Sequence, residues 1–188
     1  DLTVLSECVI EGRKTFGNII KYIKMGASPN FGNMFSMAGA SIFLPFLPLT
    51  PVQIILNNFL YDFCQLTIPS DNVDKEYLVK PKPWNIKFIK RFMVTIGIVS
   101  SLFDFITFAL LWFVFQAGPD LFRTGWFLES LATQTLVIHI IRTRKIPFLE
   151  SRPSLLLLLS SILVVLVGFI ITYTSVGTSL GFTKPSGS

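Results

Sequence analysis

Charged residues are scarce in this sequence and absent from long stretches of it. Asp, Glu, Lys and Arg make up 14% of the 188 residues, 51% are hydrophobic, and the mean hydropathy is +0.62. An ordinary soluble domain carries about 25% charged residues. The apolar residues also fall in uncharged blocks rather than at amphipathic spacing, so lipid must cover much of their surface. These features exclude an ordinary soluble domain and indicate an integral membrane protein.

A disulfide framework, a secretion signal and nucleic-acid motifs are lacking as well. Cys8 and Cys64 are the only cysteines, and they are too differently placed for a framework, so we expect reduced thiols. The first 24 residues have no apolar core before a cleavage site, so we do not expect them to be a signal peptide. The net charge is +5, but the basic residues flank apolar spans. We expect no nucleic-acid partner.

The longest uncharged block predicts a pair of helices. Residues 25–61 contain no Asp, Glu, Lys or Arg. As one helix they would be about 55 Å long, whereas a hydrocarbon core is about 30 Å thick. Pro45, Pro48 and Pro51 lie close together within the block, and each removes a backbone hydrogen-bond donor. We therefore predict a tight helical hairpin with spans at about 25–44 and 52–68.

Three further spans complete a predicted all-α transmembrane bundle. They are expected at about 92–115, 126–141 and 154–176. Residues 1–24 are predicted to form a cytoplasmic stalk helix that runs into the first span, and residues 177–188 a tail outside the cytoplasm. Of the 16 basic residues, 14 lie on one side of this arrangement, which the positive-inside rule makes cytoplasmic. The expected fold is a polytopic bundle of about five spans with its N-terminus in the cytoplasm.

Polar side chains at membrane depth are the candidate site residues, because each is costly there. Asn30 and Asn33 share a helix face through their i,i+3 spacing, and Asn58 and Asp62 through i,i+4 spacing. Counted from the two membrane edges, both pairs come near the midplane. Their amide and carboxylate oxygens suit Mg²⁺ or Ca²⁺ rather than a soft metal. Pro29 is expected to loosen its helix and to free carbonyl groups as further ligands.

The same side chains also have a purely structural interpretation. Amides often do no more than bond helices together, and we prefer this role for Asn57, which faces away from Asn58. Asp62 has no basic partner in either leg of the hairpin, so a cation, a proton or a more distant helix must neutralise it. We expect Asp62 to take part in transport. Small residues at i+4 intervals predict close helix contact in the first span: Gly32, Ser36 and Ala40.

Weaker candidates lie in the second and later spans. We predict secondary positions on an ion pathway at Tyr61, Asp104 and Gln134. For Asp104, a structural role in which it pairs with another helix is as well supported as a place on the ion pathway. Glu129 is placed within one turn of the outer edge, where its carboxylate would extend to the membrane surface.

The polar segments form short motifs spread over nearly the whole chain. Four of them are Glu11-Gly12-Arg13, Ser28-Pro29-Asn30-Phe31-Gly32-Asn33, Pro51-Val52-Gln53 and Asn58-Phe59-Leu60-Tyr61-Asp62. In this order they resemble the C-terminal membrane half of the P-type cation ATPases. Three later motifs resemble the bacterial magnesium-transporting branch of that family: Ile68-Pro69-Ser70-Asp71-Asn72-Val73-Asp74, Lys80-Pro81-Lys82-Pro83-Trp84-Asn85 and Ile141-Arg142-Thr143-Arg144-Lys145-Ile146-Pro147.

The resemblance implies that the spans are the family's fifth to ninth membrane helices and that the stalk helix couples a phosphorylation domain to the ion site. It implies Mg²⁺ as the transported ion, with ATP bound by domains outside this sequence. Asn30 and Asp62 match ion-site positions of the family. Asn33 stands where calcium and sodium–potassium pumps carry an acidic residue, which favours the magnesium branch. The Asp-Lys-Thr-Gly-Thr phosphorylation motif is absent, so the chain alone is expected to be inactive.

We therefore expect the ion-pathway portion of an ATP-driven magnesium transporter of the inner membrane, truncated relative to the complete pump. Its partners would be the lipid bilayer, the cytoplasmic domains and the remaining membrane helices of that pump. Two alternatives stay open at this point. One is another cation pump of the family, for calcium, protons or a monovalent ion. The other is a non-catalytic membrane scaffold or split subunit, against which the odd number of spans argues.

Overall fold

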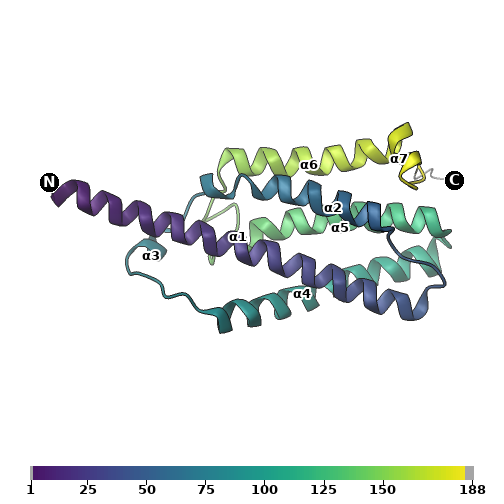
Figure 1. The fold of residues 1–188 in the computed structure, drawn as a ribbon, viewed down its shortest axis with the longest axis horizontal. Helices are drawn as coiled ribbons and strands as arrows, with labels where there is room; N and C mark the ends of the chain where they lie inside the picture. Colours follow the sequence, from purple (N-terminus) through teal and green to yellow (C-terminus); the bar gives the residue numbers. More distant parts are fainter. Residues whose placement is uncertain (1, 185–188) are drawn as a thin grey trace.

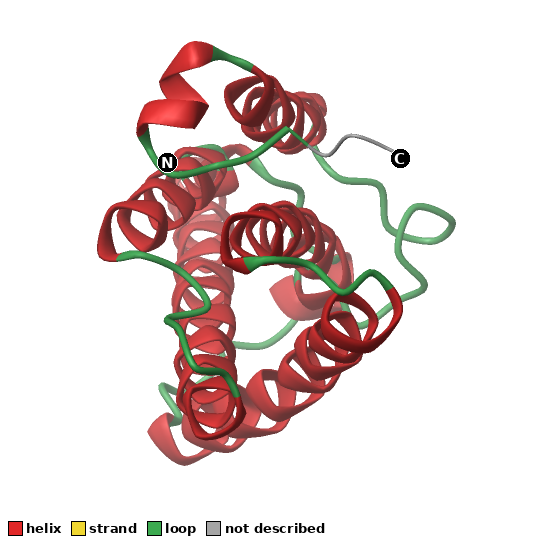
Figure 2. Cartoon of the chain, turned by 90° about the vertical axis from the view of Figure 1, so that its right-hand side faces the viewer, coloured by secondary structure: helices red, strands yellow, loops and turns green. Residues whose placement is uncertain are grey.

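The computed structural model describes residues 2–184 as a bundle of helices (Figure 1). Its long helices are α1 (Leu2–Phe43), α2 (Pro51–Gln65), α4 (Ile86–Ala109), α5 (Pro119–Ile141) and α6 (Leu155–Tyr173). The short elements are a 3-10 turn (Ile68–Ser70), α3 (Lys75–Leu78), a π-helical continuation of α4 (Leu110–Val114) and α7 (Ser175–Ser179). Seen end-on in Figure 2, the described residues form helices and loops without any strand. The predicted all-α class is confirmed.

Two helical segments of the described residues are long and apolar enough to cross a membrane. They are Ile86–Val114, with a mean hydropathy of 2.0, and Leu155–Tyr173, with 2.9. Of the 18-residue apolar stretch in each segment, only 22% and 33%, respectively, is buried inside the bundle. Apolar side chains on both therefore face outward, as they do on helices in contact with lipid.

Proline positions set the turn between α1 and α2. α1 ends at Phe43, residues 44–50 reverse the chain, and α2 begins at Pro51. Proline suits this first helical position because the N–H that it lacks would be unpaired there anyway. Thr50 and Gln53 then cap the helix reciprocally: Thr50 Oγ1 accepts from the Gln53 N–H at 3.4 Å, and Gln53 Oε1 accepts from the Thr50 N–H at 3.0 Å. The predicted helical hairpin is confirmed.

Two helices begin earlier than the expected spans. α4 begins at Ile86 because Asn85 caps it, with Asn85 Oδ1 accepting from the Phe88 N–H at 2.9 Å. α5 begins at Pro119, again with proline at its first position, so the residues before position 126 are helical rather than a connection. Glu129 consequently lies about 15 Å along α5 from the start of that helix. Its expected place within one turn of the membrane edge stays a prediction, because the start of a helix does not mark that edge.

Small residues allow α1 and α4 to approach closely, and this is the most extensive helix contact of the bundle. Gly32 and Gly97 face each other, and a Cβ atom on Gly32 would lie 3.1 Å from the Gly97 carbonyl oxygen. Ser101 Oγ donates to the Gly32 carbonyl at 3.0 Å. Ser36 and Ala40 continue the same buried face of α1. The predicted stripe of small residues is confirmed.

A buried ion-pair cluster ties together the end of the bundle from which α1 projects, here called the stalk end (Figure 1). The side chain of Asp71 is 0% exposed and accepts from Lys21 Nζ at 2.7 Å and from Arg142 Nε at 2.9 Å. The backbone N–H of Ser154 donates to the same carboxylate at 3.1 Å, and Arg142 Nη1 donates to the Ser151 carbonyl at 2.9 Å. The Asp71 cluster thus joins α1, the α2–α4 connection, the end of α5 and the start of α6.

Candidate functional site

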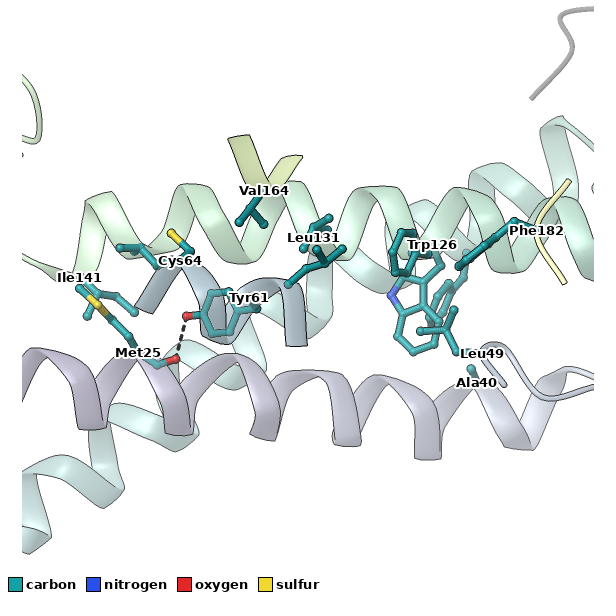
Figure 3. Packing of buried hydrophobic residues seen from close by; sticks show 14 of the residues in the cluster. Met25, Ala40, Leu49, Tyr61, Cys64, Trp126, Leu131, Ile141, Val164 and Phe182 are labelled. Atoms are coloured by element: carbon teal, nitrogen blue, oxygen red, sulfur yellow. Dashed lines mark hydrogen bonds between the residues drawn. The ribbon is translucent and has the colours of Figure 1, made fainter. Parts of the chain in front are cut away.

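Pro29 lies inside α1 without interrupting it. Because proline has no N–H, the carbonyl group of Met25 loses its normal helical partner. Tyr61 of α2 supplies the missing donor, and its hydroxyl donates to the Met25 carbonyl at 2.8 Å (Figure 3). The expected loosening of the helix is therefore wrong, and the Met25 carbonyl is engaged. Tyr61 is fully buried and holds α2 against α1 at this point.

The four predicted cation ligands differ in their burial. Asn30 and Asp62 are exposed, whereas Asn33 and Asn58 are partly buried. Among the described residues, no hydrogen bond joins Asn30 or Asp62 to Asn33 or Asn58. The four side chains therefore do not form a single hydrogen-bonded group within this chain.

Asn30 and Asp62 belong to a crossing of α1 and α2, here called the open crossing. Asn30 Nδ2 donates to the Gly26 carbonyl of its own helix at 2.8 Å. A Cβ atom on Gly26 would lie 3.4 Å from Gln65 Oε1, and Gln65 Nε2 donates to Asp62 Oδ1 at 3.4 Å. Gln65 of α2 therefore lies close to α1 here. Within residues 2–184, Asp62 has no salt-bridge partner.

Ser130 of α5 is the centre of a second group, here called the Ser130 cluster: Asn33, Asn57, Ser130 and Gln134. Ser130 Oγ donates to Asn33 Oδ1 at 3.2 Å. It accepts from Asn57 Nδ2 at 3.2 Å and from Gln134 Nε2 at 2.6 Å. Both amides thus turn their NH₂ groups toward the serine. Asn57 Oδ1 and Gln134 Oε1 are buried and have no hydrogen-bond partner in the described part of the chain.

The orphaned amide oxygens are the chemically informative feature of the Ser130 cluster. A buried acceptor without a partner costs on the order of 1–3 kcal/mol. Neutral amide oxygens are ligands that Mg²⁺ and Ca²⁺ accept, and Mg²⁺ also keeps several of its waters in protein sites. The described residues contain no group of three or more His, Cys, Asp and Glu side chains that would hold a metal ion. The cluster therefore fits a hydrated hard cation better than a soft metal.

Two carboxylates lie deeper in the bundle than Asp62. Asp104 is buried, with Oδ2 accepting from Ser36 Oγ at 2.5 Å and Oδ1 accepting from Trp126 Nε1 at 3.0 Å. It pairs with two other helices, one of the two roles that its sequence position allowed. Glu129 lies beside Asp104, and its Oε2 is buried without a hydrogen-bond partner among the described residues. The expectation that Glu129 extends to the membrane surface is wrong.

Sequence reasoning missed Asn57 and Ser130 as members of one polar group. Helical spacing carried the signal, because α2 presents a buried face at i+4 intervals: Gln53, Asn57, Tyr61 and Gln65. Ser130 and Gln134 have the same spacing on α5. Asn57 does bond across helices, as expected for a packing residue, but only its NH₂ group is used.

A comparison of two buried glutamines tests whether the Gln134 oxygen is unpaired. Gln53 uses its whole amide, since Oε1 accepts from Thr50 and Nε2 donates to the carbonyls of Leu180 and Gly181 at 3.1 and 3.2 Å. We expect Gln53→Met to lower the free energy of unfolding by about 1–3 kcal/mol. Gln134→Met should change it by less than about 0.5 kcal/mol, because removing an orphaned acceptor offsets the lost hydrogen bond. Thermal unfolding of the purified chain in detergent measures both, and equal losses would contradict the assignment.

Known proteins with similar sequences form a consistent group. The family described as "Cation transporting ATPase, C-terminus" matches residues 46–188. The "Magnesium-transporting ATPase, P-type 1" of Salmonella typhimurium strain LT2 is 51% identical over 185 residues, which cover 96% of this chain and 20% of the relative. The protein of that name from Escherichia coli strain K12 is 49% identical over 183 residues, covering 95% and 20%. The chain thus spans about a fifth of the length of the curated relatives it matches.

Proposed function

Because the chain belongs to the family of cation-transporting P-type ATPases, we propose that it supplies the ion-pathway helices of an ATP-driven magnesium transporter. The observation that carries this proposal is the Ser130 cluster, in which two buried amide oxygens have no hydrogen-bond partner among the residues that the structure describes. A passing hydrated cation would satisfy them. The names of the relatives favour Mg²⁺ as that cation.

Two successive sets of oxygens would meet the ion. The open crossing offers the carboxylate of Asp62 and the amide oxygen of Asn30. Five residues away on α2, about 7.5 Å along the helix, Asn57 contributes its orphaned oxygen to the Ser130 cluster. Asn33 belongs to the Ser130 cluster, and the partly buried Asn58 would line the path beside it. Asp62 would face helices of the complete pump that lie outside this sequence, which accounts for its exposure here.

The proposed membrane arrangement keeps the five spans at about 25–44, 52–68, 92–115, 126–141 and 154–176. The stalk end would lie in the cytoplasm, because most basic residues gather there. The end that carries α7 would lie outside, and the protein would be a multi-pass component of the inner membrane. ATP would bind to cytoplasmic domains beyond this sequence, and Mg²⁺ is the transported substrate.

α1 is suited to transmit movement from those domains to the ion path. It is continuous over about 63 Å and carries both Asn30 and Asn33. Asn33 is bonded to Ser130 of α5, so a tilt of the projecting stalk would shift one ligand of the path relative to the others. A two-state tilt of this kind would alternate access to the two sides of the membrane.

Transport measurements on a full-length pump that carries this segment test the proposal. Reconstituted into liposomes, such a pump should accumulate isotopically labelled Mg²⁺ only when ATP is supplied. Excess Ca²⁺ should compete weakly, because the neutral oxygens of the cluster hold Ca²⁺ less well than a set of carboxylates does. ATP-driven uptake of Ca²⁺ without uptake of Mg²⁺ would contradict the magnesium assignment.

A further inference from the structure

A cavity of about 590 Å³ lies at the stalk end, beside the Asp71 cluster. Its walls come from α1, α3, the start of α4 and the residues that follow α5. Lys24 of α1 is the last charged residue before the long uncharged run, and Asn85 caps the apolar helix α4. The cavity therefore lies at the level where the apolar helices begin. A volume of this size is typical of sites for small ligands.

The cavity has more positive than negative charge around it. Six cationic side chains line it: Lys21, Lys24, Lys82, Arg142, Arg144 and Lys145. Its wall also carries two acidic residues, Asp74 and Glu76. Glu76 forms a salt bridge of 2.7 Å with Lys145, whereas Asp74 accepts hydrogen bonds from the Thr143 and Ser151 hydroxyls and, at 3.5 Å, from the Arg144 backbone N–H.

Three of these cations lack a carboxylate partner in the described part of the chain. Lys21 and Arg142 share Asp71, whereas Lys24, Lys82 and Arg144 form no salt bridge. Lys24 Nζ lies over the rings of Phe88 and Phe92, 4.8 and 4.7 Å from their centroids. Lys82 Nζ lies over the ring of Tyr77 at 5.9 Å. Aromatic faces stabilise a cation but do not neutralise it.

Lys24 and Arg144 come from different elements and lie near enough to repel each other. Burial lowers the pKa of Lys24, and the positive charge of Arg144 lowers it further. Arg144 is exposed and Lys24 only partly buried, so an anion from outside can reach both. Like charges that a fold brings together without salt-bridge partners are typical of anion sites.

We propose that this cavity binds the phosphate group of an anionic ligand between Lys24 and Arg144, with Lys82 and the Tyr77 hydroxyl as further donors. Arg donates in a planar fork that matches two phosphate oxygens, and Lys adds a compact charge. Apolar side chains beside them, including Ile20 and Phe88, provide a surface for the non-phosphate part of the ligand. A phospholipid headgroup and a soluble phosphate share this chemistry.

Titration of the purified chain in a nonionic detergent tests the site and separates the two sources. The probes are short-chain phosphatidylglycerol, short-chain phosphatidylcholine and inorganic phosphate, with binding followed by calorimetry. We expect phosphatidylglycerol to bind at one site and phosphatidylcholine to bind more weakly. Arg144→Gln and Lys24→Gln should each weaken binding about tenfold. Lys90→Gln is the matched control, because Lys90 is an exposed cation of α4 that does not line the cavity.

Each outcome decides the proposal. Binding of phosphatidylglycerol that inorganic phosphate does not displace supports a lipid headgroup as the ligand. Binding of inorganic phosphate that Arg144→Gln weakens supports recognition of the phosphate group itself, from soluble ligands as well. Equal binding of the two lipids, equal effects of Arg144→Gln and Lys90→Gln, or no binding of any probe would overturn the site. Magnesium transport is not measured, so these results are independent of the proposed function.

Discussion

Asp71→Asn is expected to lower the free energy of unfolding by about 3–5 kcal/mol, because it leaves two buried cations without a counter-charge. The side chains of Asp71 and Arg142 are 0% and 1% exposed, and that of Lys21 is 10% exposed. An amide in place of the carboxylate keeps the shape but removes the negative charge that both cations need. Thermal unfolding of the purified chain in detergent measures the loss.

Asp120→Asn is the matched control for this change. Asp120 also forms a salt bridge, 3.0 Å from Arg123, but its side chain is 61% exposed. Exposed pairs of this kind contribute about 0–1 kcal/mol, so the control should unfold close to the wild-type temperature. Equal losses in the two variants would show that the Asp71 cluster does not stabilise the stalk end more than a surface pair.

The Asp71 cluster also predicts how stability depends on pH. Burial alone would raise the pKa of Asp71, but the hydrogen bonds from Arg142 and Lys21 outweigh it and hold the pKa below its ordinary value. A carboxyl group whose pKa is lower in the folded than in the unfolded protein stabilises the fold above the unfolded pKa, about pH 4. This contribution is lost as the pH falls through the folded pKa. The difference in stability between wild type and Asp71→Asn should therefore shrink below about pH 4.

The hairpin and the helix-rich class were predictable because prolines and uncharged runs act locally. Pro51 marks the start of α2, and the structure agrees. Pro119 likewise marks the start of α5, which begins before the span predicted at about 126–141.

Partners from distant segments were not predictable, because spacing along a helix does not reveal which neighbour each face meets. Pro29 was correctly seen to free a carbonyl group, but the donor that satisfies it, Tyr61, comes from another helix. Asn57 and Asn58 are adjacent in sequence, and only the rotation of α2 against α5 decides that Asn57 reaches Ser130. The Asp71–Arg142 pair likewise joins residues 71 positions apart.

Asp62→Asn is expected to raise the Mg²⁺ concentration for half-maximal transport at least about tenfold in a full-length pump that carries this segment. The open crossing has one carboxylate, and the affinity of a site for a divalent cation depends on how many charged ligands it has. Asp62 is exposed and has no salt bridge within the described residues, so its loss should hardly change the stability of this chain. Uptake of labelled Mg²⁺ into liposomes, measured against Mg²⁺ concentration, gives the shift.

The comparison of Asp62→Asn with Gln134→Met then shows which set of oxygens holds the ion. If both sets contribute, both variants should shift the half-maximal concentration, and Asp62→Asn should shift it more because it also removes a charge. Asp120→Asn, a carboxylate outside both sets, should leave it unchanged. If Asp62→Asn transports like wild type while Gln134→Met does not, the ion path follows the Ser130 cluster and Asp62 has another partner. If Gln134→Met transports like wild type while Asp62→Asn does not, ordered water rather than the transported ion satisfies the orphaned amide oxygens.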